Sequence, residues 1–343
     1  DSILENGNQE LDASSHVVSP GLIDFHAHFF DKGTVTSVNS AFFSATGVTT
    51  QVEAGSVGCG NFEFMWNNLP FEIKKQSKVY LYLATEGLVS LGHHVENIHP
   101  SYYNLKAIKQ LCSEYPEIIG LKLRISKEIA EASGTTSFDA LRRAVEIAEA
   151  CQLPLSVHIP NFQGDLSELL EILRPGDIFC HVFTPLKGIV ENGEISKAVF
   201  EGRKKGIIFE SACGKGHFTH DVGQLAIEAG FLPDIISGDF TQNTLFVKPA
   251  VSLPHLLNRF MSLGMTLSQV LTCCTTTPAK LMGMEGEIGC LKVGARADIS
   301  IFDYAEGNYK YLDAKGVETE GTHAITPKCT VMGGRIAFNQ LYY

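Results

Sequence analysis

The chain has 343 residues with a formal net charge of −11, and 44% of its residues are hydrophobic. This composition provides a large core and excludes a generally disordered chain, and the length corresponds to one large domain or two ordinary ones. The acidic balance argues against nucleic acid or an anionic membrane surface as the main partner. No apolar run reaches the roughly 18 residues of a membrane-spanning helix, so we expect no membrane partner.

The nine cysteines are odd in number and scattered, with no CxxC pair. In a chain of this length they indicate reduced thiols and a cytoplasmic protein rather than a disulfide framework. The sequence opens at Asp1 with neither Met nor a secretory signal. We therefore expect that the natural N-terminus is trimmed or not represented.

Short apolar runs alternate with longer amphipathic stretches, a pattern typical of βα units and a parallel sheet. The predicted strands are residues 19–28, 47–52, 79–85, 118–125, 155–159, 178–183, 207–211 and 235–239. Eight such strands predict an α/β fold, a closed (β/α)8 TIM barrel of the usual size of about 250 residues. The predicted helical patterns after the third strand are residues 138–151, 166–173, 195–205, 221–229, 254–263, 267–272 and 277–282.

The sequence pattern changes at Gly286, where short stretches of alternating apolar and polar residues, separated by turns, begin. Residues 289–294, 297–303 and 330–335 predict a small all-β appendage that cannot bury much by itself. We expect the opening residues to add strands to it. The predicted domains are therefore the barrel at 19–285 and a small β-domain formed by 1–18 and 286–343.

Reactive groups of such a barrel come from the carboxyl ends of its strands. Five of the eight predicted strands end in, or carry, residues of this kind, namely His26 and His28, Lys122, His158, His181 and Asp239. One histidine at a strand end is more often packed or hydrogen-bonded, and a lone HxH pair is a weak indication. Four histidines and an aspartate at one end of a barrel favour a metal site, and these donors suit Zn2+ and similar cations.

Lys122 lies in an apolar strand that would point its ammonium group into the barrel mouth, where an unpaired charge is costly. One interpretation is an ion pair with a nearby acid, or a side chain that extends to the rim. The other is that burial lowers the pKa of the amine, which then reacts with CO2 to form a carbamate able to bridge two cations.

Two segments carry a family resemblance. Val18-Ser-Pro-Gly-Leu-Ile-Asp-Phe-His-Ala-His28 resembles the first strand of the amidohydrolase superfamily, and residues 289–303 resemble its return into a β-sandwich. The ligand order also matches, over nearly the whole chain. Residues 121–126, 157–161 and 230–239 are most similar to the subgroup of deacetylases, whose relatives include dihydroorotase-like and adenine-deaminase-like proteins.

This resemblance implies two divalent cations, with Zn2+ as the best candidate, that share a hydroxide and the carbamate of Lys122. It implies that His26, His28 and Asp239 hold the inner cation and that His158 and His181 hold the outer one. Asp239 would be catalytic, accepting the proton of the attacking hydroxide and delivering it to the leaving amine.

The chain departs from the family in two places. Only 18 residues precede the HxH strand, so part of the β-sandwich is missing from this sequence. Near the seventh strand, close relatives tend to have an acidic-x-Gly-His-Gly stretch, whereas here Glu210 is followed by Ser-Ala-Cys213-Gly-Lys-Gly-His217. Because Cys213 replaces the expected histidine, substrate preference does not carry over.

Three residues are candidate substrate contacts. Arg124 shares the strand face of Lys122, where it would bind a substrate carboxylate or form a structural salt bridge. Lys215 is flanked by glycines whose backbone N–H groups could converge on an anion, although a plain flexible loop fits equally. Cys213 is expected to be a passive wall rather than a nucleophile. Three histidines without a strand-end position, His217, His220 and His255, stay outside the predicted metal set.

The leading hypothesis is a metal-dependent hydrolase that cleaves an amide or ester of a small carboxylated molecule, such as an N-acyl amino acid. A cyclic-amide hydrolase would use the same residues. A nucleobase deaminase is the alternative reaction, against which Lys122 argues because many deaminases use one metal and no lysine bridge. A non-catalytic scaffold would be expected to lose ligands, and none of the six is missing here. The β appendage also makes a homo-oligomer compatible with the sequence.

Overall fold

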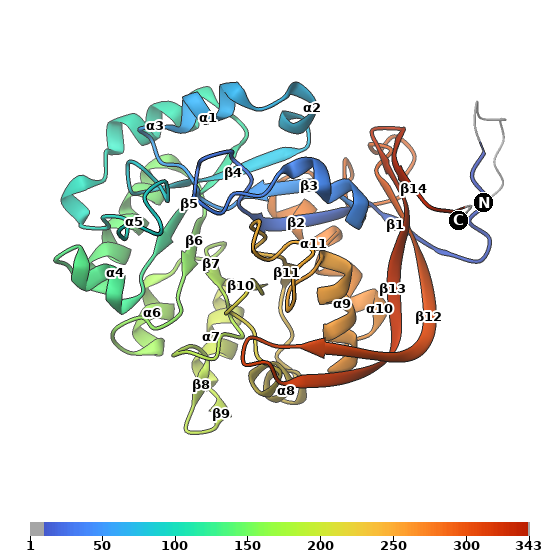
Figure 1. Cartoon of the computed structure of the whole chain (residues 1–343). Coiled ribbons are helices and arrows are strands. Elements are labelled where there is room, and N and C mark those ends of the chain that lie inside the picture. Colours follow the sequence, from blue (N-terminus) through green and yellow to red (C-terminus); the bar gives the residue numbers. More distant parts are fainter. Residues whose placement is uncertain (1–9, 342–343) are drawn as a thin grey trace.

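The computed structural model of the chain describes residues 10–341, which form a parallel barrel and an antiparallel sheet (Figure 1). The barrel strands run side by side in the order β11-β10-β7-β6-β5-β4-β3-β2. Their bounds are Leu22–Ala27 (β2), Val48–Glu53 (β3), Ser77–Tyr82 (β4), Ile118–Arg124 (β5), Leu155–His158 (β6), Ile178–Cys180 (β7), Ile208–Ala212 (β10) and Ile235–Ser237 (β11). All eight predicted strands are therefore present.

The first and last barrel strands meet at their carboxyl ends. Ala27 forms a parallel bridge with Phe240, and the His28 amide donates to the Phe240 carbonyl at 2.9 Å. Further down, the amide of Gly238 donates to Asp24 Oδ1 at 3.0 Å. These contacts make the barrel nearly closed, which confirms the predicted fold class.

Helices cover the outside of the barrel. Those of the second half match the predicted patterns within one or two residues, namely α5 (Ser137–Cys151), α6 (Leu166–Ile172), α7 (Lys197–Lys205), α8 (His220–Glu228), α9 (Leu253–Ser262), α10 (Leu267–Thr272) and α11 (Thr276–Leu281). The elements without a predicted counterpart are η1 (Ser40–Thr46), α1 (Phe62–Asn68), α2 (Phe71–Lys74), η2 (Pro100–Tyr102), α3 (Leu105–Glu114), α4 (Lys127–Ala132) and the small hairpin β8 (Val190–Glu191) and β9 (Glu194–Ile195).

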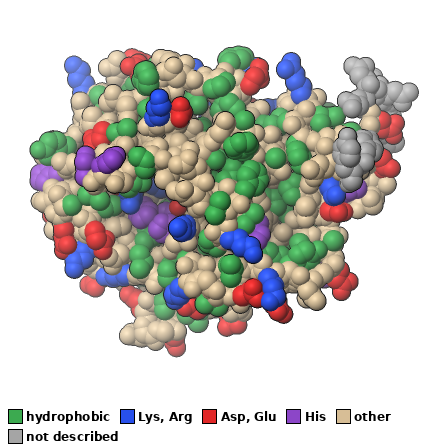
Figure 2. All heavy atoms as spheres, viewed as in Figure 1, with side chains coloured by type: hydrophobic (Ala, Val, Ile, Leu, Met, Phe, Trp, Pro, Cys, Tyr) green, Lys and Arg blue, Asp and Glu red, His purple; other side chains and the backbone are tan. Residues whose placement is uncertain are grey.

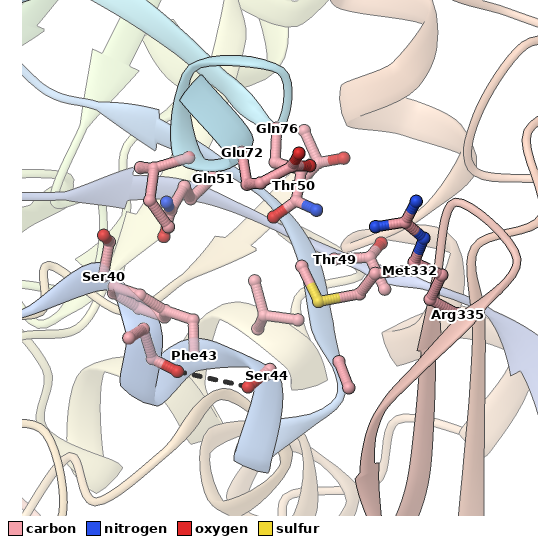
Figure 3. A pocket seen from close by; sticks show the side chains of 14 residues that line it. Ser40, Phe43, Ser44, Thr49, Thr50, Gln51, Glu72, Gln76, Met332 and Arg335 are labelled. Carbon is pink, nitrogen blue, oxygen red and sulfur yellow. Dashed lines mark hydrogen bonds between the residues drawn. The ribbon is translucent and has the colours of Figure 1, made fainter. Parts of the chain in front are cut away.

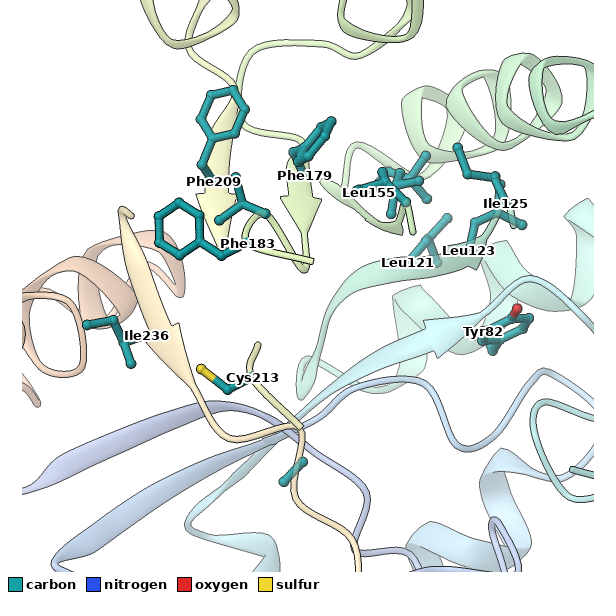
Figure 4. Close-up of a cluster of buried hydrophobic side chains, with 14 of the residues drawn as sticks. Tyr82, Leu121, Leu123, Ile125, Leu155, Phe179, Phe183, Phe209, Cys213 and Ile236 are labelled. Carbon is teal, nitrogen blue, oxygen red and sulfur yellow. The ribbon is translucent and has the colours of Figure 1, made fainter. Parts of the chain in front are cut away.

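Strand alternation places the core outside the barrel wall and the polar groups inside it. In β5, Leu121 and Leu123 are fully buried in the apolar cluster of Figure 4, between the strands and the covering helices. Lys122 and Arg124, one residue further along in each case, point to the opposite face and line the cavity at the barrel mouth. Because side chains alternate between the two faces of the strand, β5 places charged groups inside the barrel while its leucines pack against the helices outside.

The antiparallel sheet consists of β1 (Val17–Pro20), β12 (Ile299–Leu312), β13 (Glu318–Met332) and β14 (Arg335–Asn339), in that order. The predicted first strand at 19–28 is thus two strands in two different sheets. The predicted strand at 289–294 is wrong, because Gly289 and Gly294 adopt positive φ values of 66° and 89° that interrupt an extended run. The expected contribution of the opening residues begins at β1, and residues 1–9 lie outside the described part.

The β12–β13 hairpin is much longer than predicted, and in Figure 1 it extends along α9 toward α8. The Asn258 side chain of α9 fastens it, because its Nδ2 donates to the Ile325 carbonyl at 3.0 Å and its Oδ1 accepts from the Ile325 amide at 2.8 Å. At the hairpin tip, the Ala314 amide donates to the carbonyl of Phe218 at 3.0 Å. The appendage therefore contacts the loop that leaves β10. None of the helices within residues 10–341 has the length and apolar character that a bilayer crossing requires.

Candidate active site

A cavity of about 160 Å³ lies at the carboxyl ends of the barrel strands. All six predicted ligands line it, together with other side chains of the barrel mouth: His26, His28, Thr34, Thr36, Ala54, Leu88, Leu91, Lys122, Arg124, His158, His181, His217, Asp239 and Thr241. Figure 2 shows histidine side chains recessed in a hollow of this face. The structure thus brings together residues that are more than 200 positions apart in the chain.

An inner cluster forms around the carboxylate of Asp239. Its Oδ1 lies 3.5 Å from His26 Nε2 and 3.3 Å from His28 Nε2. Behind the imidazoles, His26 Nδ1 lies 3.3 Å from Glu210 Oε2, and His28 Nδ1 lies 2.9 Å from Ser56 Oγ. Buried partners on Nδ1 fix each ring and leave Nε2 directed at the cavity, which is the arrangement found around metal-ligating histidines.

An outer cluster of three imidazoles lies beside the inner one. The ring centroids of His158 and His181 are 4.5 Å apart, and those of His181 and His217 are 4.1 Å apart. His181 Nδ1 donates to the Ala212 carbonyl at 2.8 Å, so its Nε2 is the nitrogen available for a ligand. In each cluster, one donor atom from every member lies within 4.8 Å of the others, and each cluster could hold a metal ion.

His217 is a site residue that the sequence analysis left out, because it lies five residues beyond the end of β10. The loop turns back at once, since the amide of Gly214 donates to the Gly238 carbonyl at 3.0 Å and the amide of His217 donates to Cys213 at 3.1 Å. Gly214 has a φ of 50°, and a methyl group there would overlap the carboxylate of Asp239. The two glycines around Lys215 were the available signal, because they permit a tight turn that returns a side chain to the cavity.

Burial and neighbouring charges set the protonation states of the clusters. Burial lowers the pKa values of His158 and His181 well below the usual range, and adjacent imidazoles and cations lower them further. Burial alone would raise the pKa of Asp239, but its hydrogen bond with His28 and the charge of His26 hold it below its ordinary value. His158 and His181 are thus neutral and Asp239 is ionised, the forms that bind cations. Burial opposes the charge of His28, but hydrogen bonds to Asp239 and Glu53 raise its pKa to about 9, so a cation in the inner cluster would displace a proton from this imidazole.

The backbone is strained at two of these positions. His181 has a φ of 64° and Asp239 a φ of 49°, both in the left-handed region that residues with a side chain seldom occupy. His181 directly follows the end of β7, and Asp239 lies two residues beyond the end of β11. Strain of this kind costs on the order of 1–3 kcal/mol and persists where the surrounding structure needs the resulting geometry.

Lys122 is 2% exposed, and its nearest polar neighbours are neutral. Its Nζ lies 3.5 Å from Ser156 Oγ and 3.9 Å from Cys180 Sγ. Within residues 10–341, no carboxylate oxygen comes within 4.0 Å of this Nζ. Lys122 therefore neither forms an ion pair with an acid within 4.0 Å nor extends to the rim of the barrel, which were the two alternatives to a carbamate.

Arg124 forms the salt bridge that the sequence analysis left open. Its guanidinium contacts Glu96, which is 1% exposed and also accepts from the Tyr82 hydroxyl at 2.6 Å. Arg124 nevertheless lines the cavity, so a second role toward a substrate is compatible with its position. The other two predicted contacts lie elsewhere, since Cys213 is fully buried beneath the loop and Lys215 is exposed, and neither is among the residues that line the cavity.

A second cavity, of about 310 Å³, lies away from the strand ends, between η1, β3, α2 and the end of β13 (Figure 3). Serine, threonine and glutamine side chains line it with apolar groups. Its titratable side chains among the described residues are Glu72 and Arg335, without a histidine, a cysteine or a buried acid. The larger cavity therefore lacks the donors of a reaction centre, and the cavity at the barrel mouth is the candidate active site.

An eight-stranded barrel whose strand ends bring histidines, a lysine and an aspartate into one cavity defines a barrel hydrolase. The model of the amidohydrolase family matches residues 220–337. The chain is 30% identical over 329 residues to a deacetylase of Agrobacterium fabrum (strain C58), covering 95% of this chain and 80% of that protein. The chain belongs to the amidohydrolase family, and it is a hydrolase acting on C–N bonds.

Solved structures agree with this assignment. A dihydroorotase is 28% identical with a TM-score of 0.83, and the match covers 94% of this chain and 84% of that one. An adenine deaminase is 24% identical with a TM-score of 0.86, covering 95% of this chain and 88% of that one. The second similarity concerns the fold alone.

Proposed function

We propose that this protein is a binuclear metal-dependent hydrolase that cleaves an amide or ester bond of a small carboxylated substrate, such as an N-acyl amino acid. The observation that carries the proposal is the pair of donor clusters that share one cavity with a buried lysine, Lys122, which has no carboxylate oxygen within 4.0 Å in the described part of the chain. The similarity to a deacetylase over most of both chains supports acyl-group removal as the reaction.

The donors fit two divalent cations, and their chemistry favours Zn2+. His26, His28 and Asp239 would hold the inner cation, and His158 and His181 the outer one. Lys122 would serve both as a carbamate, which its neutral amine forms with CO2 with release of a proton to the solvent. The carbamate carries a negative charge that favours cation binding, whereas the free amine carries none. Divalent cations in this position would lower the pKa of a water molecule and polarise the substrate carbonyl.

Asp239 is the proton carrier in this proposal. Its side chain is 16% exposed toward the cavity, and its contacts with His26 and His28 keep it ionised and fixed in place. A carboxylate in this state accepts a proton from the attacking water and returns it to the leaving amine or alcohol.

The cavity sets the size and character of the substrate. Its volume of about 160 Å³ favours a small group as the part of the substrate that is bound inside it. Leu88 and Leu91 form an apolar wall, and Thr34, Thr36 and Thr241 supply hydroxyls. Arg124 at the edge would bind the substrate carboxylate with the donors that Glu96 does not use.

A cyclic-amide hydrolase of the dihydroorotase type is the second candidate. It is favoured by the structural match at 28% identity and would use the same donors. Deamination of a nucleobase is less favoured, because the buried Lys122 has no evident use at a single cation. Nine free cysteines support the expected cytoplasmic location, and a small molecule remains the expected partner, with self-association compatible.

The test begins with metal analysis of the purified protein, followed by a screen of N-acetyl and N-formyl derivatives of D- and L-amino acids with the matching α-hydroxy acid esters. Dihydroorotate and adenine are included, with ammonia release measured for adenine. We expect about two bound cations per chain and turnover of an acylated carboxylic acid. Protein that folds but binds no divalent cation would contradict the proposal.

A further inference from the structure

We propose that His217 is a metal ligand of the outer cluster, so that each of the two cations is held by three side chains besides Lys122. This inference rests on the proposed binuclear function and adds a residue to it. The inner set is then two imidazoles and a carboxylate, and the outer set is the three imidazoles of His158, His181 and His217.

His217 lies next to the other two imidazoles of the outer cluster. Its ring centroid lies 4.1 Å from that of His181 and 5.1 Å from that of His158, and its Nε2 lies 4.0 Å from Asp239 Oδ2. Its side chain is 25% exposed, and the exposed part faces the cavity that it helps to line. No hydrogen-bond acceptor is within reach of its buried Nδ1 in the described part of the chain. Three imidazoles gathered without mutual hydrogen bonds are most simply explained by a shared cation.

The loop that carries His217 is fixed by contacts with several other segments. The carbonyl of Phe218 accepts from Ala314 at 3.0 Å, and the amide of Thr219 donates to the Phe183 carbonyl at 3.2 Å. Phe218 is 1% exposed, and the guanidinium carbon of Arg259 lies 3.9 Å from its ring centroid. A ligand on a loop fixed in this way is preorganised and loses little conformational entropy when it binds.

Arg259 supports the loop that carries His217 through its contact with Phe218. It is fully buried in α9, donates from Nη1 to the Leu312 carbonyl at 3.2 Å, and within residues 10–341 its Nε and Nη2 have no hydrogen-bond partner. A buried guanidinium is costly, and the aromatic face of Phe218 compensates part of this cost, together with the nearby Cys213 and Asp313. Arg259 is therefore a positioning residue for the loop, acting through Phe218 on its neighbour His217.

Different donors give the two positions different metal preferences. Carboxylate oxygens accept Mn2+ readily, whereas a set of nitrogen donors favours Zn2+ and other later transition metals. With His217 as a ligand, the outer position consists of nitrogen donors apart from the Lys122 carbamate and is the more selective of the two. Without it, the outer position offers two imidazoles and is the weaker one.

The experiment measures metal content and affinity rather than turnover. Wild type and His217→Ala are loaded with Zn2+, dialysed against graded concentrations of a chelator and analysed for metal per chain. His93→Ala is the matched control, because it removes an exposed imidazole outside the cavity. We expect wild type and control to keep two cations, and His217→Ala to keep one and to bind the second roughly tenfold or more weakly.

A second variant covers the case in which the alanine variant does not fold. His217→Asp keeps a donor but replaces nitrogen by oxygen, so we expect two cations with the outer position shifted toward Mn2+ in a Zn2+/Mn2+ competition. Two cations bound with wild-type affinity and selectivity in both variants would overturn this inference and leave the proposed function intact. A wild-type chain that binds no cation would overturn both.

Discussion

Arg124 Nη1 lies 3.1 Å from Glu96 Oε1 and 3.2 Å from Glu96 Oε2, so one nitrogen of the guanidinium serves both oxygens of a buried carboxylate. The Glu96 side chain is 1% exposed, and that of Arg124 is 20% exposed at the cavity edge. The carboxylate thus fixes the guanidinium from the protein side, and the remaining donors are left for the cavity. The salt bridge to Glu96 is therefore the observed role of Arg124, and the proposed contact with a substrate carboxylate would use the other donors of the guanidinium.

Replacement of Arg124 separates these roles. For Arg124→Met we expect KM for a carboxylated substrate to rise about tenfold to 100-fold, because a hydrogen bond to a charged group contributes about 1.5–3 kcal/mol. The KM of an uncharged analogue should stay the same, and steady-state kinetics on both substrates measures the difference. The unfolding free energy should fall by about 3 kcal/mol, because Glu96 is left buried and unpaired, and Arg124→Met with Glu96→Gln should recover part of that loss. Equal KM changes for both substrates would limit Arg124 to the structural role.

Gly214 gives the most local test of the site geometry. Because of its φ of 50° and the overlap of any Cβ with Asp239, we expect Gly214→Ala to displace the carboxylate or the loop. Stability should fall by about 1–3 kcal/mol, and turnover should fall more than the folded fraction accounts for. Gly216→Ala in the same loop is the control, because a Cβ there meets no atom within 4 Å. Urea unfolding and kcat are compared, and identical behaviour of the two variants would contradict the role of Gly214.

Asp239→Asn tests proton transfer. The amide keeps the size of the side chain but can neither accept a proton at neutral pH nor hold the charge between His26 and His28. We expect a loss of about 10²- to 10⁴-fold in kcat, the usual contribution of general acid–base catalysis. Metal analysis of the same preparation is the control, because loss of the inner cation would lower kcat for a different reason. Full turnover with full metal content would remove Asp239 from the mechanism.

Lys122 is tested through the carbamate. In Lys122→Met the apolar part of the side chain remains and the amine is lost, so the fold should persist while metal content falls toward zero. For wild type, apo-protein reconstituted in buffer freed of CO2 should take up metal more slowly than in buffer with added bicarbonate. Metal uptake is followed by elemental analysis, and a rate independent of bicarbonate would indicate that the amine acts without CO2.

The sequence was sufficient where a residue lies on a regular element. The eight strands could be predicted from apolar runs, and His26, His28, His158 and Asp239 from their positions at strand ends, because the (β/α)8 topology brings all strand ends together. His217 could not be placed in this way, since its position depends on the contacts of Gly214, Phe218 and Arg259 with distant segments. The length of the β12–β13 hairpin was missed for a related reason, because the polar residues from Tyr304 to Leu312 are extended only through pairing and packing on α9.

His255 of α9 predicts an acid sensitivity that is independent of the metal site. Burial and the charges of Arg259 and Lys248 lower its pKa from 6.5 to about 4. Above pH 6.5 the imidazole is neutral in both states and its full contribution to stability is present. As the pH falls from 6.5 to 4, His255 binds a proton in the unfolded chain but stays neutral in the folded chain. The free energy of unfolding is therefore lower by about 2 kcal/mol at pH 5 than above pH 6.5.

We expect His255→Gln to lose less unfolding free energy than wild type between pH 7.5 and pH 5, measured by urea unfolding, with the exposed His93→Gln as the control. Parallel pH profiles for wild type and His255→Gln would show that this imidazole titrates normally in the folded protein.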